Sequence, residues 1–242
     1  MIDLHTHILP RMDDGAKTSD ESLQLLQMQG QQGVSRCALT PHFYSDREDA
    51  PRFLARRRDS ARRLAERVQA LSSEERAAMP TLYLGAEVAW SSHLNGIPEI
   101  PELCLAGTDR LLLELPFTPW SASLPEELYR FAKESGVTPI LAHLERYESI
   151  QPKELFRDIL LLGFCVQVGC GDLLRPLRRG RSLQLLKSGA DCVLASDCHD
   201  LKKRVPNLRD AMAFTEKKLG SETGSQLQRQ AELLLAGGTA LV

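Results

Sequence analysis

Asp3-Leu4-His5-Thr6-His7 completes the first predicted strand of the chain, which begins at Ile2. Side chains of an extended strand alternate between its two faces, so His5 and His7 point to the same side. Two imidazoles facing one point can begin a metal site, but two ligands alone leave a transition metal mostly hydrated. A metal site therefore requires further His, Asp or Glu side chains at the ends of later strands. Without them the pair is an ordinary polar strand edge.

The rest of the sequence alternates short apolar runs with helical patterns. Six further strands are expected at residues 34–39, 81–88, 111–116, 137–142, 164–168 and 192–195. Helices are expected at 18–30, 51–71, 125–135, 152–162, 182–187, 207–219 and 222–236, and an irregular loop at 95–107. This rhythm indicates parallel βαβ units, and seven strands predict a closed or nearly closed α/β barrel, with an open doubly wound sheet as the alternative. No repeat, low-complexity segment or linker divides the sequence, so we expect a single domain over residues 1–242.

The composition is that of a globular enzyme. Hydrophobic residues make up 43% and charged residues 26% of the chain, and the formal net charge of −2 gives no general reason to expect binding to nucleic acid or an anionic membrane. No apolar run approaches membrane-spanning length, and no export signal is evident, so we expect a cytoplasmic protein. The six cysteines show no C-x-x-C spacing, and we expect reduced thiols in packed positions.

The predicted helix at 51–71 is strongly basic. Its arginines are Arg56, Arg57, Arg58, Arg62, Arg63 and Arg67. We interpret them as a solvated helix face that is partnered by Asp59 and Glu66. A docking surface for an acidic partner is the alternative.

Polar side chains with metal-binding groups follow most of the predicted strands. They are His5 and His7, His42, Glu87, Glu114, His143, and Asp197 with His199. In a parallel α/β barrel the carboxyl ends of all strands share one rim, where active sites lie. Five of the six histidines fall at such positions, and only His93 is left, as an expected surface residue. The condition set by His5 and His7 is met, and the sequence predicts a metal site at this rim.

The ordered motifs of the chain resemble a known superfamily. They are Asp3-x-His5-x-His7, Asp13-Asp14-Gly15, Thr40-Pro41-His42, Gly85-Ala86-Glu87, His143-Leu-Glu-Arg146-Tyr147 and Ser196-Asp197-x-His199. This set is similar to that of the polymerase and histidinol phosphatase (PHP) superfamily. Within it, the sequence most resembles the manganese-dependent bacterial protein tyrosine phosphatases of capsular and exopolysaccharide synthesis, and the likeness spans essentially the whole chain.

The resemblance implies a distorted (β/α)7 TIM-like barrel of the PHP type with three divalent metal ions. Manganese is the preferred ion, and iron or zinc are also compatible with imidazole and carboxylate ligands. By resemblance, His5, His7, Glu87 and Asp197 hold the first ion; Glu87, Glu114 and His143 hold the second; and Asp14, His42 and His199 hold the third. The carboxylates of Asp14 and Glu114 favour the tyrosine phosphatase branch. The implied partner is the phosphotyrosine tail of a bacterial tyrosine kinase.

The expected chemistry is hydrolysis of a phosphomonoester. A cluster of divalent ions can lower the pKa of a bridging water and clamp the reacting oxygens. Arg146 and Arg204 are the expected phosphate clamps, because guanidinium groups match phosphoryl oxygens. A salt bridge on the rim is the alternative for each arginine. For Arg204 the family pattern is less complete, because Val-Pro follows it where Pro-Pro is usual and Asp200 stands where an amide is usual. Asp3 is expected to orient the His5 imidazole as an acceptor.

Other readings of the sequence remain open at this point. The cysteine phosphatase signature C-x5-R occurs twice, at Cys104 to Arg110 and at Cys198 to Arg204, but neither introduces the helix that would activate a thiolate. A PHP phosphatase for a small phosphomonoester such as histidinol phosphate is the second hypothesis. A metal-binding regulatory protein without turnover is the third, and a nuclease is disfavoured by the lack of a basic groove in the overall charge.

Overall fold

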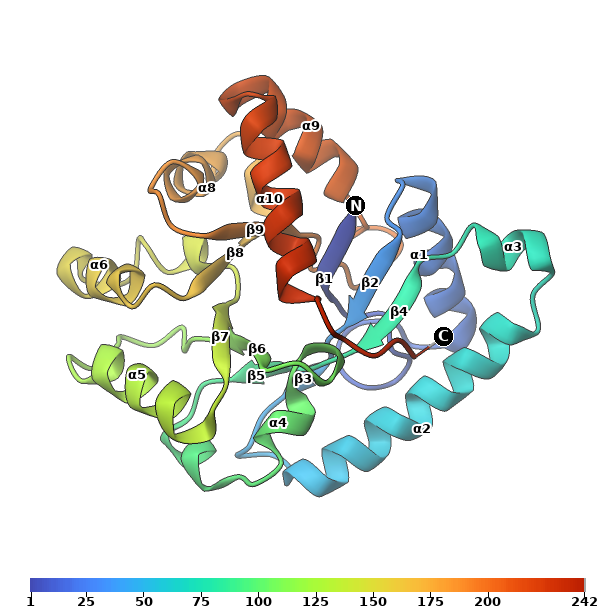
Figure 1. Ribbon diagram of the computed structural model, residues 1–242, viewed down its shortest axis with the longest axis horizontal. Helices are drawn as coiled ribbons and strands as arrows, with labels where there is room; N and C mark the ends of the chain where they lie inside the picture. Colours follow the sequence, from blue (N-terminus) through green and yellow to red (C-terminus); the bar gives the residue numbers. More distant parts are fainter. Residues whose placement is uncertain (242) are drawn as a thin grey trace.

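The computed structural model describes residues 1–241, and its strands are all parallel (Figure 1). The strands are β1 (Ile2–Thr6), β2 (Arg36–Leu39), β3 (His42–Phe43), β4 (Thr81–Leu84), β5 (Glu87–Ala89), β6 (Arg110–Glu114), β7 (Thr138–Leu141), β8 (Cys165–Gly169) and β9 (Cys192–Ala195). They form two sheets, with orders β1-β2-β4 and β3-β5-β6-β7-β8-β9. β3 continues β2, and β5 continues β4, each after a break of two residues. Counted along the chain, there are therefore seven strand paths, as the sequence predicts.

Backbone contacts between the first and last strand paths close the barrel. Thr6 pairs with Cys198 in an isolated parallel bridge. The Asp197 amide donates to the His5 carbonyl at 2.9 Å, and the His7 amide donates to the Cys198 carbonyl at 2.9 Å. The expected distorted seven-stranded barrel is confirmed, and the open doubly wound alternative is wrong. The distortion lies in the two strand breaks, which split the wall into two sheets.

Helices surround the strands, as Figure 1 shows. They are α1 (Ser19–Gln31), α2 (Ala50–Gln69), α3 (Ser73–Ala77), α4 (Ile100–Leu103), α5 (Leu124–Ser135), α6 (Lys153–Leu161), α7 (Cys170–Leu174), α8 (Arg179–Leu186), α9 (Leu208–Leu219) and α10 (Ser221–Leu234), with short 3-10 turns η1 (Ser92–Gly96), η2 (Leu105–Gly107) and η3 (Leu144–Arg146). All seven expected helices are present. The sequence missed α3 and α7 and the short helical turns within 95–107, because four or five residues are too few to show a helical period. Among residues 1–241, no helix is long and apolar enough to cross a membrane.

Local sequence explains how the helices begin and which face they bury. Thr18 caps α1 by accepting from the Glu21 amide at 3.1 Å, and the Glu21 side chain accepts from the Lys17 amide, one residue before the cap. Asp49 caps α2 by accepting from the Arg52 amide at 2.8 Å. The apolar face of α2 is buried, with Phe53, Leu54, Ala61, Leu64 and Val68. Its arginines consequently lie mostly on the outer face.

One apolar cluster joins the strands to the closing segment of the chain. It includes Leu4, Ala38, Leu112, Ile140 and Val193 from five strand paths, together with Leu234 and Leu235 at the end of α10. Each of these side chains is at most 4% exposed. The cluster fills the body of the barrel with apolar side chains. The polar residues that follow the strands are therefore collected at the opposite, carboxyl-terminal rim.

A β-bulge in β1 changes the direction of its side chains. Asp3 pairs with Cys37 and Thr6 pairs with Leu39, so three steps along β1 match two steps along β2. The extra residue breaks the alternation of faces. Asp3 consequently lies against α1, where it accepts from the Gln29 side chain at 2.7 Å. His5 lies within the bulged interval between Asp3 and Thr6, His7 follows it, and the two imidazoles face each other inside the rim.

Candidate metal centre

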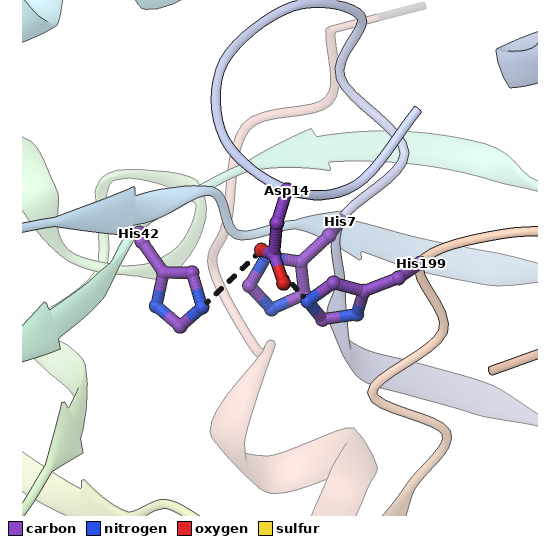
Figure 2. A group of neighbouring side chains, drawn as sticks. All are labelled: His7, Asp14, His42 and His199. Carbon is purple, nitrogen blue, oxygen red and sulfur yellow. Dashed lines mark ion pairs between the residues drawn. The ribbon is translucent and has the colours of Figure 1, made fainter. Parts of the chain in front are cut away.

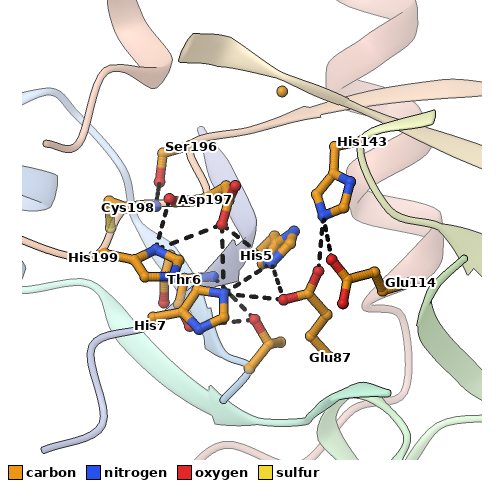
Figure 3. A network of polar contacts seen from close by, with 12 residues as sticks. His5, Thr6, His7, Glu87, Glu114, His143, Ser196, Asp197, Cys198 and His199 are labelled. Carbon is orange, nitrogen blue, oxygen red and sulfur yellow. Dashed lines mark hydrogen bonds and ion pairs between the residues drawn. The ribbon is translucent and has the colours of Figure 1, made fainter. Parts of the chain in front are cut away.

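All nine predicted metal ligands lie at the carboxyl-terminal rim of the barrel (Figures 2 and 3). The two strand breaks help to place them, because His42 and Glu87 are the first residues after the breaks and pair with each other in register. His143 and Asp197 both follow strands and both have positive φ angles, 34° and 52°. Left-handed conformations are costly for residues other than glycine and cluster at functional sites. The local strain is consistent with side chains turned into the rim rather than along the strands.

His5 and His7 face each other through their Nε2 atoms, which are 3.0 Å apart. His5 Nδ1 lies 3.1 Å from Gln167 Oε1, and His7 Nδ1 lies 2.7 Å from Asp13 Oδ2. Those oxygens only accept hydrogen bonds, so each Nδ1 carries a proton, and in the neutral imidazole each Nε2 presents a lone pair. Two lone pairs at this separation repel each other unless a cation lies between or beside them. The pair therefore has the tautomers and the orientation of metal ligands.

Glu87 is the carboxylate that links the ligand groups. It is fully buried, and its Oε2 lies 3.1 Å from His5 Nε2, 3.2 Å from His7 Nε2 and 3.0 Å from His42 Nδ1. Its Oε1 lies 2.9 Å from His143 Nε2. Burial alone would raise the pKa of Glu87, but the surrounding histidines hold it well below its usual range. An ionised bridging carboxylate is the result.

Glu114 and His143 extend the cluster on one side of Glu87. His143 Nε2 lies 3.5 Å from Glu114 Oε1 (Figure 3). Burial, reinforced by the neighbouring Glu87, raises the pKa of Glu114 to about 7. Burial also lowers the pKa of His143 to about 4, which keeps its imidazole neutral at physiological pH. A neutral imidazole and two close carboxylates form a pocket that a divalent cation would stabilise.

Asp14 forms a further group with three histidines on the other side of the rim (Figure 2). Asp14 Oδ1 lies 3.2 Å from His199 Nε2 and 3.7 Å from His42 Nε2, and the rings of His7 and His199 stack at 3.7 Å. Ligand atoms of His7, Asp14, His42 and His199 all lie within 4.8 Å of one another. The expected ligand set of Asp14, His42 and His199 therefore has His7 as a fourth member. His42 also approaches Glu87 and Glu114, so adjacent groups share histidines.

Unsatisfied polar atoms show that these residues fit a metal cluster. Glu87 Oε2, His42 Nδ1 and His199 Nε2 are buried, and despite the short distances given above they are not oriented for a hydrogen bond with their neighbours. Buried polar atoms in proteins are nearly always hydrogen-bonded, so several exceptions in one site require an explanation. Bound cations would satisfy them. Nitrogen and oxygen ligands without a thiolate suit manganese, iron or zinc.

Asp13 and Gly15 position the loop that carries Asp14. Besides His7 Nδ1, Asp13 accepts from the amides of His42 and Gly15, both at 2.9 Å. A Cβ atom at Gly15 would lie 2.1 Å from the His7 carbonyl oxygen. Only glycine fits this approach of loop to strand. The Asp-Asp-Gly motif therefore combines an orienting carboxylate, a candidate ligand and a packing requirement.

Arg146 and Arg204 reach the rim from opposite sides of Asp197. Arg146 Nη2 donates to Asp197 Oδ2 at 2.6 Å, and Arg204 Nη2 donates to Asp197 Oδ1 at 2.8 Å. Asp197 Oδ1 in turn lies 3.5 Å from His5 Nε2. In this structure both arginines make the salt bridges that the sequence offered as their alternative role. Their position next to the ligand cluster is also the one that a phosphate clamp requires.

The expectation that Asp3 orients the His5 imidazole is wrong. The carboxylate of Asp3 accepts from the His5 amide at 3.4 Å and from the Ser196 amide at 3.0 Å, and does not contact the His5 ring. Gln167 holds the ring instead, and the bulge in β1 accounts for the difference. The sequence contained one signal for Gln167, because it is the only polar side chain within the apolar strand Cys165–Gly169.

The remaining sequence-based expectations concern His93 and the cysteines. His93 is exposed, as expected. All six cysteines are buried and free. Burial raises the pKa of Cys104 to about 12 and also raises the pKa of Cys198. Neither C-x5-R match therefore provides a reactive thiolate.

Comparisons with known proteins agree with this geometry. Residues 1–235 match the family model described as capsular polysaccharide synthesis, CpsB/CapC. The chain is 31% identical to the tyrosine-protein phosphatase YwqE of Bacillus subtilis, over 99% of this chain and 93% of that protein. It is 29% identical to the tyrosine-protein phosphatase CpsB of Streptococcus agalactiae serotype III, over 94% of each chain. A solved structure from a study of YwqE and of Streptococcus pneumoniae CpsB, described as unique metal-dependent tyrosine phosphatases, superposes with a TM-score of 0.82 at 27% identity, covering 99% of this chain and 96% of that one.

Proposed function

The chain belongs to the CpsB/CapC family of capsular polysaccharide synthesis, and from this premise we propose that it is a metal-dependent phosphatase acting on phosphotyrosine. The observation that carries the proposal is the convergence of nine imidazole and carboxylate side chains on one rim, with buried nitrogen and oxygen atoms left without hydrogen bonds. The proposed substrate is the phosphotyrosine tail of a bacterial tyrosine kinase. A cytoplasmic protein, as expected from the sequence, suits this substrate.

Three divalent ions, preferably manganese, are proposed for the rim. His5, His7, Glu87 and Asp197 would hold the first ion; Glu87, Glu114 and His143 the second; and Asp14, His42 and His199 the third, with His7 close to this last group. When bound, such ions lower the pKa of a water shared between them and neutralise phosphoryl charge. Glu87 suits a bridging role because its two oxygens face different histidines.

The side chains around the ligands fix their protonation. Gln167 and Asp13 accept from Nδ1 of His5 and His7, which leaves both Nε2 atoms available as ligands. Arg146 and Arg204 bind the phosphoryl oxygens and counter their charge. A tyrosine leaving group has a pKa near 10 and departs more easily than an aliphatic alcohol, so no strong general acid is assigned.

Metal analysis coupled to phosphatase assays tests the proposal. The purified protein should contain divalent metal, and hydrolysis of p-nitrophenyl phosphate and of a phosphotyrosine peptide should be lost with chelator and restored by manganese. Activity that survives complete metal removal would refute the mechanism. If metal-loaded protein hydrolyses no aryl phosphate, the chain would be a metal-binding protein without turnover. Faster turnover of histidinol phosphate than of phosphotyrosine peptides would favour the small-substrate alternative.

Two histidine variants make this test specific. His5→Ala should lower both the metal content and the activity, because His5 Nε2 faces His7, Glu87 and Asp197. His93→Ala is the matched control, because His93 is exposed and is not among the rim residues. Equal losses in the two variants would contradict the assignment of His5.

A further inference from the structure

A basic cavity of about 550 Å³ lies beside the ligand cluster and shares residues with it. Arg146, Asp197 and Arg204 line the cavity and also belong to the rim described above. Its other charged residues, Asp172, Arg175, Arg178 and Lys203, have no role in the proposed reaction. The cavity is therefore continuous with the proposed phosphate site and extends beyond it.

The cavity has more positive charge than its own carboxylates can balance. Five basic side chains and two carboxylates line it. Asp172 alone faces three guanidinium groups: Arg178 Nη1 at 3.1 Å, Arg146 Nε at 3.6 Å and Arg175 Nη1 at 3.9 Å. Asp197, the second carboxylate, is already shared by Arg146, Arg204 and three histidines. In a chain of net charge −2, this local excess is a specific feature of the cavity.

Arg175 and Arg178 have free donors for a ligand. Their side chains are 57% and 58% exposed, and each makes one ion pair among the described residues, with the same oxygen of Asp172. A guanidinium has five N–H donors in a planar fork that matches a carboxylate or a phosphate. Lys203 adds an exposed ammonium group on the other wall. This arrangement suits an anionic group that enters from solvent.

We propose that Arg175, Arg178 and Lys203 bind a second anionic side chain, a phosphate or a carboxylate, next to the phosphotyrosine in the same peptide. The inference rests on the proposed function and adds a preference for acidic sequence around the scissile residue. Asp172 contacts both Arg146 and Arg178, so a single carboxylate separates the proposed phosphate clamp from the proposed subsite. An extended peptide advances about 3.4 Å per residue, so a side chain near the phosphotyrosine can reach it.

The lining of the cavity favours a peptide over a nucleic acid. No aromatic side chain lines it; the uncharged residues are Gly171, Leu174, Pro176, Ser196, Val205 and Asn207. Single-stranded nucleic acids are usually held by aromatic rings on which the bases stack. A compact basic cavity without such rings is suited to one anionic side chain.

Peptide kinetics test the inference. Three phosphotyrosine peptides would differ only in the flanking residues, which are glutamine in the first, glutamate in the second and a second phosphotyrosine in the third. We expect kcat/KM to be about tenfold higher with an acidic flank, mainly through a lower KM, because a few partly exposed charged contacts add a modest increment. In the double variant Arg175→Ala, Arg178→Ala, the ratio of acidic to neutral peptide should fall towards one. If only the peptide with the second phosphotyrosine has a higher kcat/KM, the bound group is a phosphate. If the glutamate peptide also has a higher kcat/KM, the subsite accepts carboxylates as well.

The ratio of kcat/KM on the acidic peptide to kcat/KM on the neutral peptide makes the test independent of folding and of general activity. Both peptides are measured on the same protein, so a smaller active fraction lowers both values equally. Arg157→Ala is the matched control, because Arg157 is a 68% exposed arginine of α6 whose one ion pair within residues 1–241 is with Asp158. Equal kcat/KM for neutral and acidic peptides, or an unchanged ratio in the double variant, would overturn the inference and leave the proposed function intact. If no phosphotyrosine peptide is hydrolysed, the proposed function fails and the inference fails with it.

Discussion

Helix α2 and the basic cavity are both rich in arginine, but their charges are balanced in different ways. On α2, Arg56 pairs with Glu48, Arg62 with Asp59 and Glu66, Arg63 with Asp59, and Arg67 with Asp20. Most of the arginines of α2 thus have a nearby carboxylate. In the cavity, three guanidinium groups share Asp172 and two share Asp197. The expected partnering by Asp59 and Glu66 is confirmed for Arg62 and Arg63. The expectation is wrong for Arg57, which is buried.

The difference shows that the ratio of guanidinium to carboxylate groups, rather than the number of arginines, marks a binding surface. A balanced face gains little from an added anion, because its charges are already neutralised. An unbalanced cavity gains more, since the ligand supplies the missing negative charge. The predictions below test whether this contrast holds in activity and in stability.

Arg146→Ala should have the largest effect. Removing a phosphate-binding guanidinium should lower kcat/KM on phosphotyrosine peptides by about 10²- to 10³-fold. Arg146→Lys should recover only part of the activity, because an ammonium group cannot bind bidentately. Steady-state kinetics with metal analysis would check this. Normal kinetics in Arg146→Ala would show that its salt bridge with Asp197 is its whole role.

Arg57→Met tests the one arginine of α2 that is buried. Arg57 is 7% exposed and donates to the carbonyls of Gly85 and Glu102, both at 2.8 Å. Loss of two buried charge-assisted hydrogen bonds should lower the free energy of unfolding by about 3 kcal/mol. Urea denaturation would measure it, with Arg58→Met on the exposed face as the control. Equal midpoints for the two variants would contradict a structural role for Arg57.

Arg204→Ala should have a smaller effect on activity than Arg146→Ala. The Arg204 side chain is 38% exposed, compared with 29% for Arg146, and water screens its contacts more strongly. We expect kcat/KM to fall by about tenfold, with a weaker inhibition by inorganic phosphate. If Arg204→Ala lost as much activity as Arg146→Ala, the two guanidinium groups would have to be ranked as equals.

Arg62→Ala should have the smallest effect. Its two ion pairs, with Asp59 and Glu66, are exposed, so the midpoint of urea denaturation should stay at the wild-type value. The kcat/KM on both neutral and acidic peptides should stay at the wild-type value. If kcat/KM fell on acidic peptides only, the acidic partner would bind at α2 rather than at the cavity. This is the alternative that the sequence left open.

The sequence predicted the barrel and the set of rim residues because both depend on local patterns. Strands alternate with helices, and histidines and carboxylates follow the strands at positions that parallel topology brings together. The ion pairs within α2 were readable for the same reason, since Asp59, Arg63 and Glu66 lie within one or two turns. The pair of Arg67 with Asp20 joins distant parts of the chain and was not predicted. Helices as short as α7 left no such pattern.

The remaining features depend on contacts between distant segments. The basic cavity combines Arg146, Arg178 and Arg204 from three parts of the chain, so no sequence window contains it. The bulge in β1 depends on pairing with β2, and it reversed the expected direction of Asp3. Helical spacing places Arg57 four residues from Phe53 and Ala61, on the buried face of α2. Its partners, the carbonyls of Gly85 and Glu102, could not be read from the sequence.

The bulge in β1 also determines which length changes the chain can accept. It adds one residue to β1 relative to β2 between Asp3 and Thr6, the interval that contains His5. Deleting one residue there would restore a regular strand and a fully paired ladder. The composition of the strand would give no sign that this deletion is harmful. The direction of His5 and His7 relative to the rim would then be lost together with their shared contact to Glu87. Chains that align with this one but lack the extra residue should therefore fold as barrels without binding metal at this rim.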